Sequence, residues 1–260
     1  MLRREFLGFL TTIGASELTA PAPAAPEPGR RPPIRAICFD LLTIFDPRSV
    51  ARAAETLVPK RGLELWNVWK TRQFEYSWLR ASAGKYVDFE AVTAQALTYA
   101  AKDLKVSITP TEQRRLVDSY SELEPWPDAR DALLSWKSSG LKLAPLANFS
   151  PKQITRLLDR SGLASLFDAL ISTDLAKTYK PDPRAYALGP AFLRLPREQI
   201  VFSAFGAWDA AGAKWFGFPT FWVNRLGVTG EELIPPDASG ADFAALASWL
   251  TTIGHEGEYR

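Results

Sequence analysis

The chain has 260 residues, of which 47% are hydrophobic and 23% are charged. This composition is typical of a globular protein with one large domain, or a core plus an insertion, and not of a disordered chain. The net charge of +2 gives no sign of a nucleic-acid surface, and the single cysteine and single histidine argue against a disulfide, a thiolate metal cluster and a histidine-based triad. Any catalysis must therefore use carboxylates, lysines and backbone dipoles.

The N-terminal residues resemble an export signal. Arg3-Arg4-Glu5-Phe6-Leu7 is a twin-arginine pattern, and the weakly apolar stretch that follows is too short to span a bilayer. Residues 19–33 are rich in proline and alanine, and Ala22-Pro23-Ala24 offers a small-residue cleavage site. We expect residues 1–33 to be an export signal and linker, and the mature protein to lie in the bacterial periplasm without a membrane association. A disordered tail is the alternative.

The remaining chain predicts an α/β fold with a helical insertion. Residues 34–40 (IRAICFD) form a short apolar run that predicts a buried strand. Residues 47–124 show helical spacing instead, with Trp66, Trp69, Tyr76 and Leu79 on one face and with Phe89, Val92, Ala96 and Tyr99 on another. Residues 124–127 (EPWP) read as a rigid exit linker.

Strands and helices alternate after this linker. The pattern predicts helices at 128–139, 151–162, from about 183, at 209–217 and at 240–253, and strands at 141–147, 167–173, 200–205 and 219–223. Such alternation is typical of a doubly wound parallel sheet. We therefore expect a core formed by residues 34–46 and 125–254, with residues 47–124 inserted after the first strand as a helical cap.

Polar residues follow four of the predicted strands. Asp40 comes after the first strand, Asn148 after the second, Lys180 after the third and Asp209 after the fourth. Ligands in open α/β sheets bind at the carboxyl ends of the strands. A single polar residue after a strand is weak evidence, but one after each strand predicts that the four side chains meet in one crevice.

Asp40 is the first candidate for a nucleophile. A carboxylate that leaves an apolar strand lies near turn amides, which stabilise its anion. Lys180 lies in the proline-flanked sequence Tyr179-Lys180-Pro181-Asp182-Pro183. Its ammonium could pair with Asp40 and Asp209 and keep both ionised despite their mutual repulsion. An aspartate that merely caps a helix and a solvated surface lysine are the alternatives.

These residues also carry a family resemblance. Residues 36–46 (AICFDLLTIFD), 146–150 (LANFS), 179–186 (YKPDPRAY) and 207–217 (AWDAAGAKWFG) resemble the four motifs of the haloacid dehalogenase superfamily. Residues 69–80 (WKTRQFEYSWLR) and 85–89 (KYVDF) in the cap are similar to the L-2-haloacid dehalogenases, the type II enzymes. The similarity extends over nearly all of residues 34–226.

The resemblance implies a role for each matching residue. Asp40 would be the nucleophile, Thr43 would support its loop, Asn148 would help to bind the substrate carboxylate and Lys180 would anchor charge. Asp209 would orient or activate water, and Lys70 stands where the family has an arginine near the halide. The family's substrate-binding positions correspond here to Leu41, Leu42, Phe74, Phe89, Ala147, Tyr186 and Trp208. For the aromatic residues, ordinary core packing is the alternative.

The implied reaction needs no metal or other cofactor. Asp40 would displace halide from a small 2-halo carboxylic acid, and water would cleave the resulting aspartyl ester to give a 2-hydroxy acid of inverted configuration. Lys180 and loop amides would carry the charge. The family further implies a possible homodimer.

The chain departs from the family pattern at four places. Asp40 and Thr43 are three residues apart where the family has four, Ala147 replaces a serine, and Ala204-Phe205-Gly206 replaces Ser-Ser-Asn. Lys70 for arginine keeps the charge but gives up the planar fork. A non-catalytic or altered-specificity binding protein is therefore an alternative. A superfamily phosphatase is a further one, but Leu42 occupies the position of the second aspartate that phosphoryl transfer and its magnesium ion need.

Overall fold

The computed structural model describes residues 32–255. The twin-arginine pattern and the candidate cleavage site lie outside the described residues. No helix within the described range is both long enough and apolar enough to cross a membrane.

The core is a six-stranded sheet in which every neighbouring pair is parallel. Its strands, in spatial order, are β5 (Ile171–Ser172), β4 (Lys142–Ala147), β1 (Ala36–Phe39), β6 (Ile200–Ala204), β7 (Thr220–Val223) and β8 (Ala238–Gly240). The chain runs outward from β1 in both directions, so the sheet is doubly wound and its crevice lies at the carboxyl ends of the central strands. The predicted fold class is confirmed.

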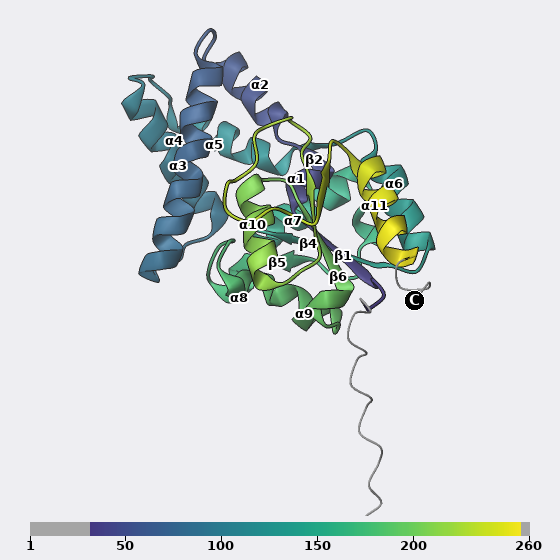
Figure 1. Cartoon of the computed structure of the whole chain (residues 1–260). Helices are drawn as coiled ribbons and strands as arrows, with labels where there is room; N and C mark the ends of the chain where they lie inside the picture. Colours follow the sequence, from purple (N-terminus) through teal and green to yellow (C-terminus); the bar gives the residue numbers. More distant parts are fainter. Residues whose placement is uncertain (1–31, 256–260) are drawn as a thin grey trace, which may run out of the picture. The chain divides into compact units, whose positions relative to one another are not determined.

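Helices cover both faces of the sheet (Figure 1). On one face, α6 (Ala129–Ser138), α7 (Pro151–Ser161) and α11 (Phe243–His255) pack against the side chains of alternate strand residues. On the other face lie α8 (Pro183–Tyr186), α9 (Leu188–Leu193) and α10 (Ala207–Phe216). Strand residues such as Phe39 and Phe202 are fully buried, one on each face, which explains the unbroken apolar runs of these strands.

Four α-helices follow one another in the segment inserted after β1 and α1. They are α2 (Arg48–Leu57), α3 (Gly62–Ala83), α4 (Phe89–Asp103) and α5 (Pro110–Asp118), and we call them the cap. The short antiparallel strands β2 (Phe45–Asp46) and β3 (Glu124–Pro125) pair at the two ends of this segment. Because the described residues fall into one compact unit, the boundary between cap and core at 46/47 and 124/125 stays a prediction.

The buried face of α3 differs from the predicted one. Its buried residues are Gly62, Leu65, Trp69, Gln73 and Ser77. Leu79, which the sequence pattern placed on the inner face, is 63% exposed. The long helix carries large apolar residues on several sides, so spacing alone chose the wrong set. A buried polar pair, Gln73 and Thr93, joins α3 to α4 through a hydrogen bond of 2.5 Å.

The edges of the sheet also differ from the prediction. The strand expected at 167–173 is reduced to the two residues of β5, and a short 3-10 helix (Thr173–Ala176) begins directly after it. Strand β8 was missed, and the last helix begins at Phe243 and not at 240. Gly240 ends β8 where an added Cβ would lie 2.3 Å from the Cβ of Ala245, so its small size is a packing requirement.

Candidate active site

Asp40 lies directly after β1, in a turn that fixes its carboxylate. Oδ1 accepts the backbone N–H of Leu42 at 2.8 Å and caps the short helix α1 (Leu41–Ile44). The hydroxyl of Thr43 donates to the carbonyl oxygen of Asp40 at 2.7 Å, and its N–H donates to the same oxygen at 3.0 Å. Although the turn is one residue shorter than the family pattern, Thr43 still braces the backbone of Asp40.

Lys180 joins the two carboxylates. Its Nζ lies 2.6 Å from Oδ2 of Asp40 and 2.6 Å from Oδ2 of Asp209, and its side chain is fully buried. Burial alone would lower the pKa of the ammonium, but the attraction of Asp209 and of Asp40 outweighs it and the pKa is raised. The ammonium is therefore charged at neutral pH and neutralises one carboxylate.

Asp209 lies in the first turn of α10 and is completely buried. Its Oδ2 accepts from Lys180, and its Oδ1 accepts the hydroxyl of Tyr186 at 2.7 Å. Burial raises the pKa of Asp209 to about 7, with the negative charge of Asp40 also raising it and Lys180 opposing the rise. Lys180 lowers this pKa but does not offset the effect of burial, so the expectation that the ammonium keeps both acids ionised stays a prediction.

Asn148 follows β4 and holds the lysine-bearing loop. Its Oδ1 accepts the backbone N–H of Lys180 at 3.0 Å and the hydroxyl of Thr173 at 3.2 Å. Both bonds use the amide oxygen, so the amide nitrogen is the end of Asn148 that can donate to a ligand. Asn148 is among the residues that line the cavity in front of Asp40.

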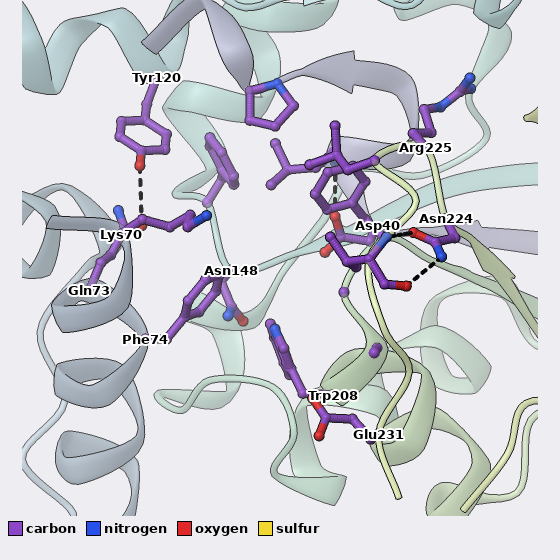
Figure 2. Close-up of a pocket in the computed structure, with 18 of the residues that line it drawn as sticks. Asp40, Lys70, Gln73, Phe74, Tyr120, Asn148, Trp208, Asn224, Arg225 and Glu231 are labelled. Carbon is purple, nitrogen blue, oxygen red and sulfur yellow. Dashed lines mark hydrogen bonds between the residues drawn. The ribbon is translucent and has the colours of Figure 1, made fainter. Parts of the chain in front are cut away.

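A cavity of about 260 Å³ opens in front of Asp40, between the cap and the carboxyl ends of the strands. Figure 2 shows Asp40 and Asn148 between the α3 side chains Lys70 and Phe74 on one side and the loop after β7 on the other. Most of the lining is apolar. It includes Leu42, Pro47, Trp66, Phe74, Phe89, Phe149, Phe205, Trp208, Leu226 and Val228.

Lys70 brings a positive charge to this cavity. Its Nζ lies 4.3 Å from the centre of the Trp66 ring, and among residues 32–255 no carboxylate pairs with it. Burial lowers the pKa of its ammonium. A half-buried cation with an aromatic face behind it and no counterion favours an anionic ligand.

The structure separates the predicted site residues into two groups. Those that line the cavity are Asp40, Leu42, Lys70, Phe74, Phe89, Asn148 and Trp208. Lys180 and Asp209 lie behind Asp40, and Thr43 is buried in its turn. The structure thus brings Asp40, Asn148, Lys180 and Asp209 together at one end of the sheet.

Three residues expected at the substrate lie elsewhere. Leu41 and Ala147 are buried in the apolar core and are not among the residues that line the cavity. Tyr186 is fully buried against Phe202, with its hydroxyl on Asp209. Its ring packs in the core and its hydroxyl bonds to Asp209, so Tyr186 does not line the cavity.

The loop after β7 was missed by the sequence-based analysis. Asn224, Arg225, Leu226, Val228, Thr229 and Glu231 line the cavity. Nε of Arg225 donates to the carbonyl oxygen of Thr43 at 3.0 Å, and its guanidinium pairs with Asp128 at 2.9 Å. Asn224 follows its strand directly, as Asp40 follows β1, so the rule that selected the other four residues would have found it too.

Glycine at position 206 shapes the wall beside the nucleophile. An added Cβ there would lie 2.7 Å from Nε1 of Trp208, so the indole occupies the space in which a side chain at 206 would begin. Gly206, which stands where the resembling enzymes carry an asparagine, therefore leaves this space to the indole of Trp208.

Comparisons with known proteins agree with this geometry. The model of the haloacid dehalogenase-like hydrolases matches residues 34–217. The chain is 41% identical over 227 residues to the (S)-2-haloacid dehalogenase of Pseudomonas sp. (strain YL), covering 86% of this chain and 98% of that protein. It resembles the crystal structure of an L-2-haloacid dehalogenase with a TM-score of 0.83 and 37% identity, over 85% of this chain and all of the other.

A further solved structure bears on the chemistry. It is the L-2-haloacid dehalogenase of Xanthobacter autotrophicus with chloropropionic acid covalently bound, at a TM-score of 0.78 and 32% identity over 84% of this chain and 98% of that one. The extent of these matches is decisive for the family. This chain belongs to the haloacid dehalogenase-like hydrolases and, among them, to the (S)-2-haloacid dehalogenases.

Proposed function

We propose that this protein is a metal-independent hydrolase that removes halide from a small 2-halo carboxylic acid, with Asp40 as the nucleophile. The observation that carries the proposal is the position of Asp40. It lies at the base of a largely apolar cavity, held by three hydrogen bonds of its turn and one ion pair, with its carboxylate facing the space where a ligand fits. The covalently bound chloropropionic acid of the Xanthobacter autotrophicus enzyme supports a covalent route.

In the first step, a carboxylate oxygen of Asp40 attacks C2 of the substrate from the side opposite the halogen. The new C–O bond forms as the carbon–halogen bond breaks, and the halide leaves with the bonding electron pair. Holding the two reactants in line supplies up to about 7–11 kcal/mol of the barrier. Lys70 and the amide nitrogen of Asn148 are the donors available for the anionic groups of substrate and product.

In the second step, water adds to Cγ of Asp40 and the bond between Cγ and the substrate oxygen breaks. The departing alkoxide takes one proton of that water to become a 2-hydroxy acid, and the other proton passes to solvent. One oxygen of the regenerated Asp40 then comes from water. Because both oxygens of Asp209 are already used by Lys180 and Tyr186, we assign Asp209 to holding the ammonium rather than to contact with this water.

The missing serine and asparagine side chains favour one competing function. Ala147 and Ala204 are buried and offer no hydroxyl, and Trp208 fills the space beside Gly206. Each lost donor to a transition state is worth about 2.7–4 kcal/mol in other enzymes. A protein that binds halo acids without turning them over is therefore the second candidate, and the experiment must separate binding from turnover.

A single-turnover experiment in heavy-oxygen water tests the proposal. Residues 34–260 are mixed in excess over L-2-chloropropionate without added metal, and the protein is then digested for mass spectrometry. We expect stoichiometric chloride release and one heavy oxygen in the peptide that contains Asp40. Asp40→Asn should abolish both, whereas Asp103→Asn, an exposed cap residue, should change neither.

The possible results divide the candidates. Chloride release that survives Asp40→Asn would remove the assignment of the nucleophile. Substrate binding without chloride, over chloro-, bromo- and fluoro-acids, would leave the binding protein as the better account.

We also propose that residues 1–33 direct export and that the mature enzyme acts in the bacterial periplasm, as the twin-arginine pattern suggests. Fusing these residues to a reporter and comparing Arg3→Lys/Arg4→Lys with the unchanged leader tests this. A cytoplasmic reporter in both cases would contradict it. A homodimer, which the family suggests, is tested by light scattering of residues 34–260.

A further inference from the structure

Two tyrosines connect the cap to the segment of the core that carries Lys180. The hydroxyl of Tyr86 donates to Oδ1 of Asp174 at 2.5 Å, across 88 residues of sequence. The hydroxyl of Tyr179 donates to the carbonyl oxygen of Val87 at 2.6 Å, across 92 residues. The two rings are 5.2 Å apart. We call Tyr86, Asp174 and Tyr179 the tyrosine latch.

The cap side of the latch is a fixed turn. Helix α3 ends at Ala83, and Gly84, with φ +64°, reverses the chain. Nη1 of Arg80 donates to the carbonyl oxygen of Lys85 at 2.9 Å, and Asp88 caps the start of α4. Residues 84–88 are therefore held between two cap helices. The position of Tyr86 therefore depends on the position of α3 and α4.

The core side of the latch is built into the active site. The N–H of Asp174 donates to Oγ of Ser172 at 3.1 Å, and this hydroxyl donates to the carbonyl oxygen of Phe149 at 2.7 Å. The neighbouring Thr173 donates to Oδ1 of Asn148. The acceptor of Tyr86 thus lies in the same short segment that holds the cavity residues Asn148 and Phe149.

Tyr179 directly precedes Lys180, and the two side chains are used in different ways. Tyr179 is fully buried and gives its hydroxyl to the cap, while Lys180 gives its ammonium to Asp40. The backbone between them is pinned by the bond from the N–H of Lys180 to Asn148. Burial raises the pKa of both tyrosine hydroxyls, so both keep their protons at neutral pH and can donate.

The latch lies beside residues that close the cavity from the cap. Phe89, three residues after Tyr86, lines the cavity and packs on Phe149 with ring centres 4.9 Å apart. Lys70 and Phe74 reach the cavity from α3, whose end leads into the latch turn. Movement of the cap away from the core would therefore break both latch bonds. The same movement would remove Lys70, Phe74 and Phe89 from the cavity lining.

We propose that Tyr86 and Tyr179 are positioning residues that couple docking of the cap to the placement of Lys180. This inference rests on the proposed function of Asp40 and Lys180. Neither tyrosine lines the cavity. Tyr86 acts through Asp174 and Tyr179 acts through the backbone of the next residue. With the cap docked, the ammonium is held between its two carboxylates and the cavity is complete.

The experiment compares three variants of the full chain. Tyr86→Phe removes one latch hydroxyl and keeps the ring. Asp174→Asn keeps an acceptor without its charge. Tyr99→Phe is the matched control, because Tyr99 is another cap tyrosine for whose hydroxyl the described residues provide no hydrogen bond. Each variant is measured for halide release, for thermal unfolding and for hydrogen exchange of the peptides that cover residues 172–180.

A hydrogen bond to a charged group shifts a two-state equilibrium by about tenfold or more when it is lost. We expect Tyr86→Phe to lower kcat/KM about tenfold and to speed exchange in residues 172–180 by a similar factor, while β1 and β4 stay protected. Asp174→Asn should give a smaller change in the same direction, and Tyr99→Phe should change neither quantity.

The alternative outcomes are distinguishable. Unchanged kcat/KM and unchanged local exchange in Tyr86→Phe would overturn the proposal. Exchange that rises across the whole sheet together, with kcat/KM constant per folded molecule, would also overturn it, since the bond would then serve stability alone. If the unaltered protein releases no halide, the proposed function fails, but the exchange measurement still decides whether Tyr86 holds the lysine-bearing segment.

Discussion

The core wall and the cap wall of the cavity are built on different physical principles. The core wall is a buried chain of charges in which Lys180 contacts Asp40 and Asp209 at 2.6 Å each. The cap wall is apolar, with Phe74 and Phe89 beside a single cation, Lys70, that has no carboxylate partner in residues 32–255. One wall has nearly all of its polar groups paired with one another. The other leaves its charge for a ligand.

This difference bears on which departures from its relatives the fold of the chain tolerates. The charge chain cannot lose a member without leaving another buried charge uncompensated. Uncharged core positions beside this chain can change without leaving a buried charge unpaired, as at Ala147 and Gly206, and the indole of Trp208 fills the space beside Gly206. We therefore expect substitutions in the core wall to affect both folding and turnover, and substitutions in the cap wall to affect ligand affinity.

Lys180→Met gives the largest test of this comparison. It leaves Asp40 and Asp209 facing each other without the ammonium, and we expect a loss of about 3–5 kcal/mol in the free energy of unfolding together with the loss of halide release. Lys180 lowers the pKa of Asp209, so removing the cation raises that pKa further and part of the lost stability should return as the pH falls. Urea unfolding at several pH values measures this.

The matched control is Lys214→Met. Lys214 also pairs with a carboxylate, that of Asp237, but its side chain is 23% exposed. We expect a loss of about 1 kcal/mol or less. Equal losses for the two lysines would contradict the view that burial of the charge chain is what makes it indispensable.

Asp209→Asn tests the next largest effect, which depends on pH. Burial raises the pKa of Asp209 from 3.8 to about 7 in the folded protein. A carboxyl whose folded pKa is raised stabilises the fold while it is protonated, and this contribution is lost as the pH rises toward about 7. The free-energy difference between the unaltered protein and Asp209→Asn should therefore decrease from about pH 4 to pH 7.

Asp168→Asn should show the opposite trend. The hydrogen bonds and charge of its partners, Lys137 first among them, hold the pKa of Asp168 below 3.8 against the effect of burial. Its contribution is present above the unfolded pKa and is lost as the pH falls. The two variants should therefore change the pH dependence of the free energy of unfolding in opposite directions. If both change it in the same direction, the raised pKa of Asp209 is not what sets the pH dependence at that site.

The parts of the core wall that could be predicted from the sequence follow from one geometric rule. Parallel strands end at one edge, so Asp40, Asn148, Lys180 and Asp209 had to converge if the strands were correctly identified. The same rule also selects Asn224, which follows β7, but no polar residue after that strand was among the predicted ones. The fold class followed from alternation of strands and helices in the same way.

The remaining features of the site, which are the directions of individual side chains, could not be predicted from the spacing of residues in the sequence. Tyr186 and Trp208 are both aromatic residues near a strand end, yet one is buried behind Asp209 and the other faces the cavity. The direction of each side chain is set by how α8 and α10 pack, which is a tertiary property. The buried polar pair of Gln73 and Thr93 on the cap is likewise invisible to a pattern that looks for apolar residues.

Lys70→Met tests the cap wall. If the ammonium binds an anionic part of the substrate, its loss removes one charged hydrogen bond, and we expect KM to rise about tenfold with a smaller change in kcat and almost none in unfolding. Because burial lowers the pKa of Lys70, KM of the unaltered enzyme should also begin to rise below the pH at which an ordinary lysine loses its proton.

Lys70→Arg separates charge from packing. The guanidinium keeps its proton at any pH used and can still lie on the Trp66 ring, so KM should stay low and the alkaline rise should disappear. A rise in KM that persists in Lys70→Arg would mean that another group titrates, and Lys70 would then lose its assignment as the anion-binding cation.

Thr43→Val is the smallest test and asks how much of the nucleophile's placement comes from a side chain. The hydroxyl of Thr43 donates to the carbonyl oxygen of Asp40, but its own N–H donates to the same oxygen, and Arg225 holds the carbonyl oxygen of Thr43 from the other side. With two backbone contacts left, we expect a loss of about 1 kcal/mol in the free energy of unfolding and a decrease of less than about tenfold in kcat.

Thr43→Ser, which keeps the hydroxyl, should lie close to the unaltered protein. A much larger loss in Thr43→Val alone would mean that the shortened turn depends on this one hydroxyl, and that the backbone of Asp40 is less firmly held than the rest of the core wall.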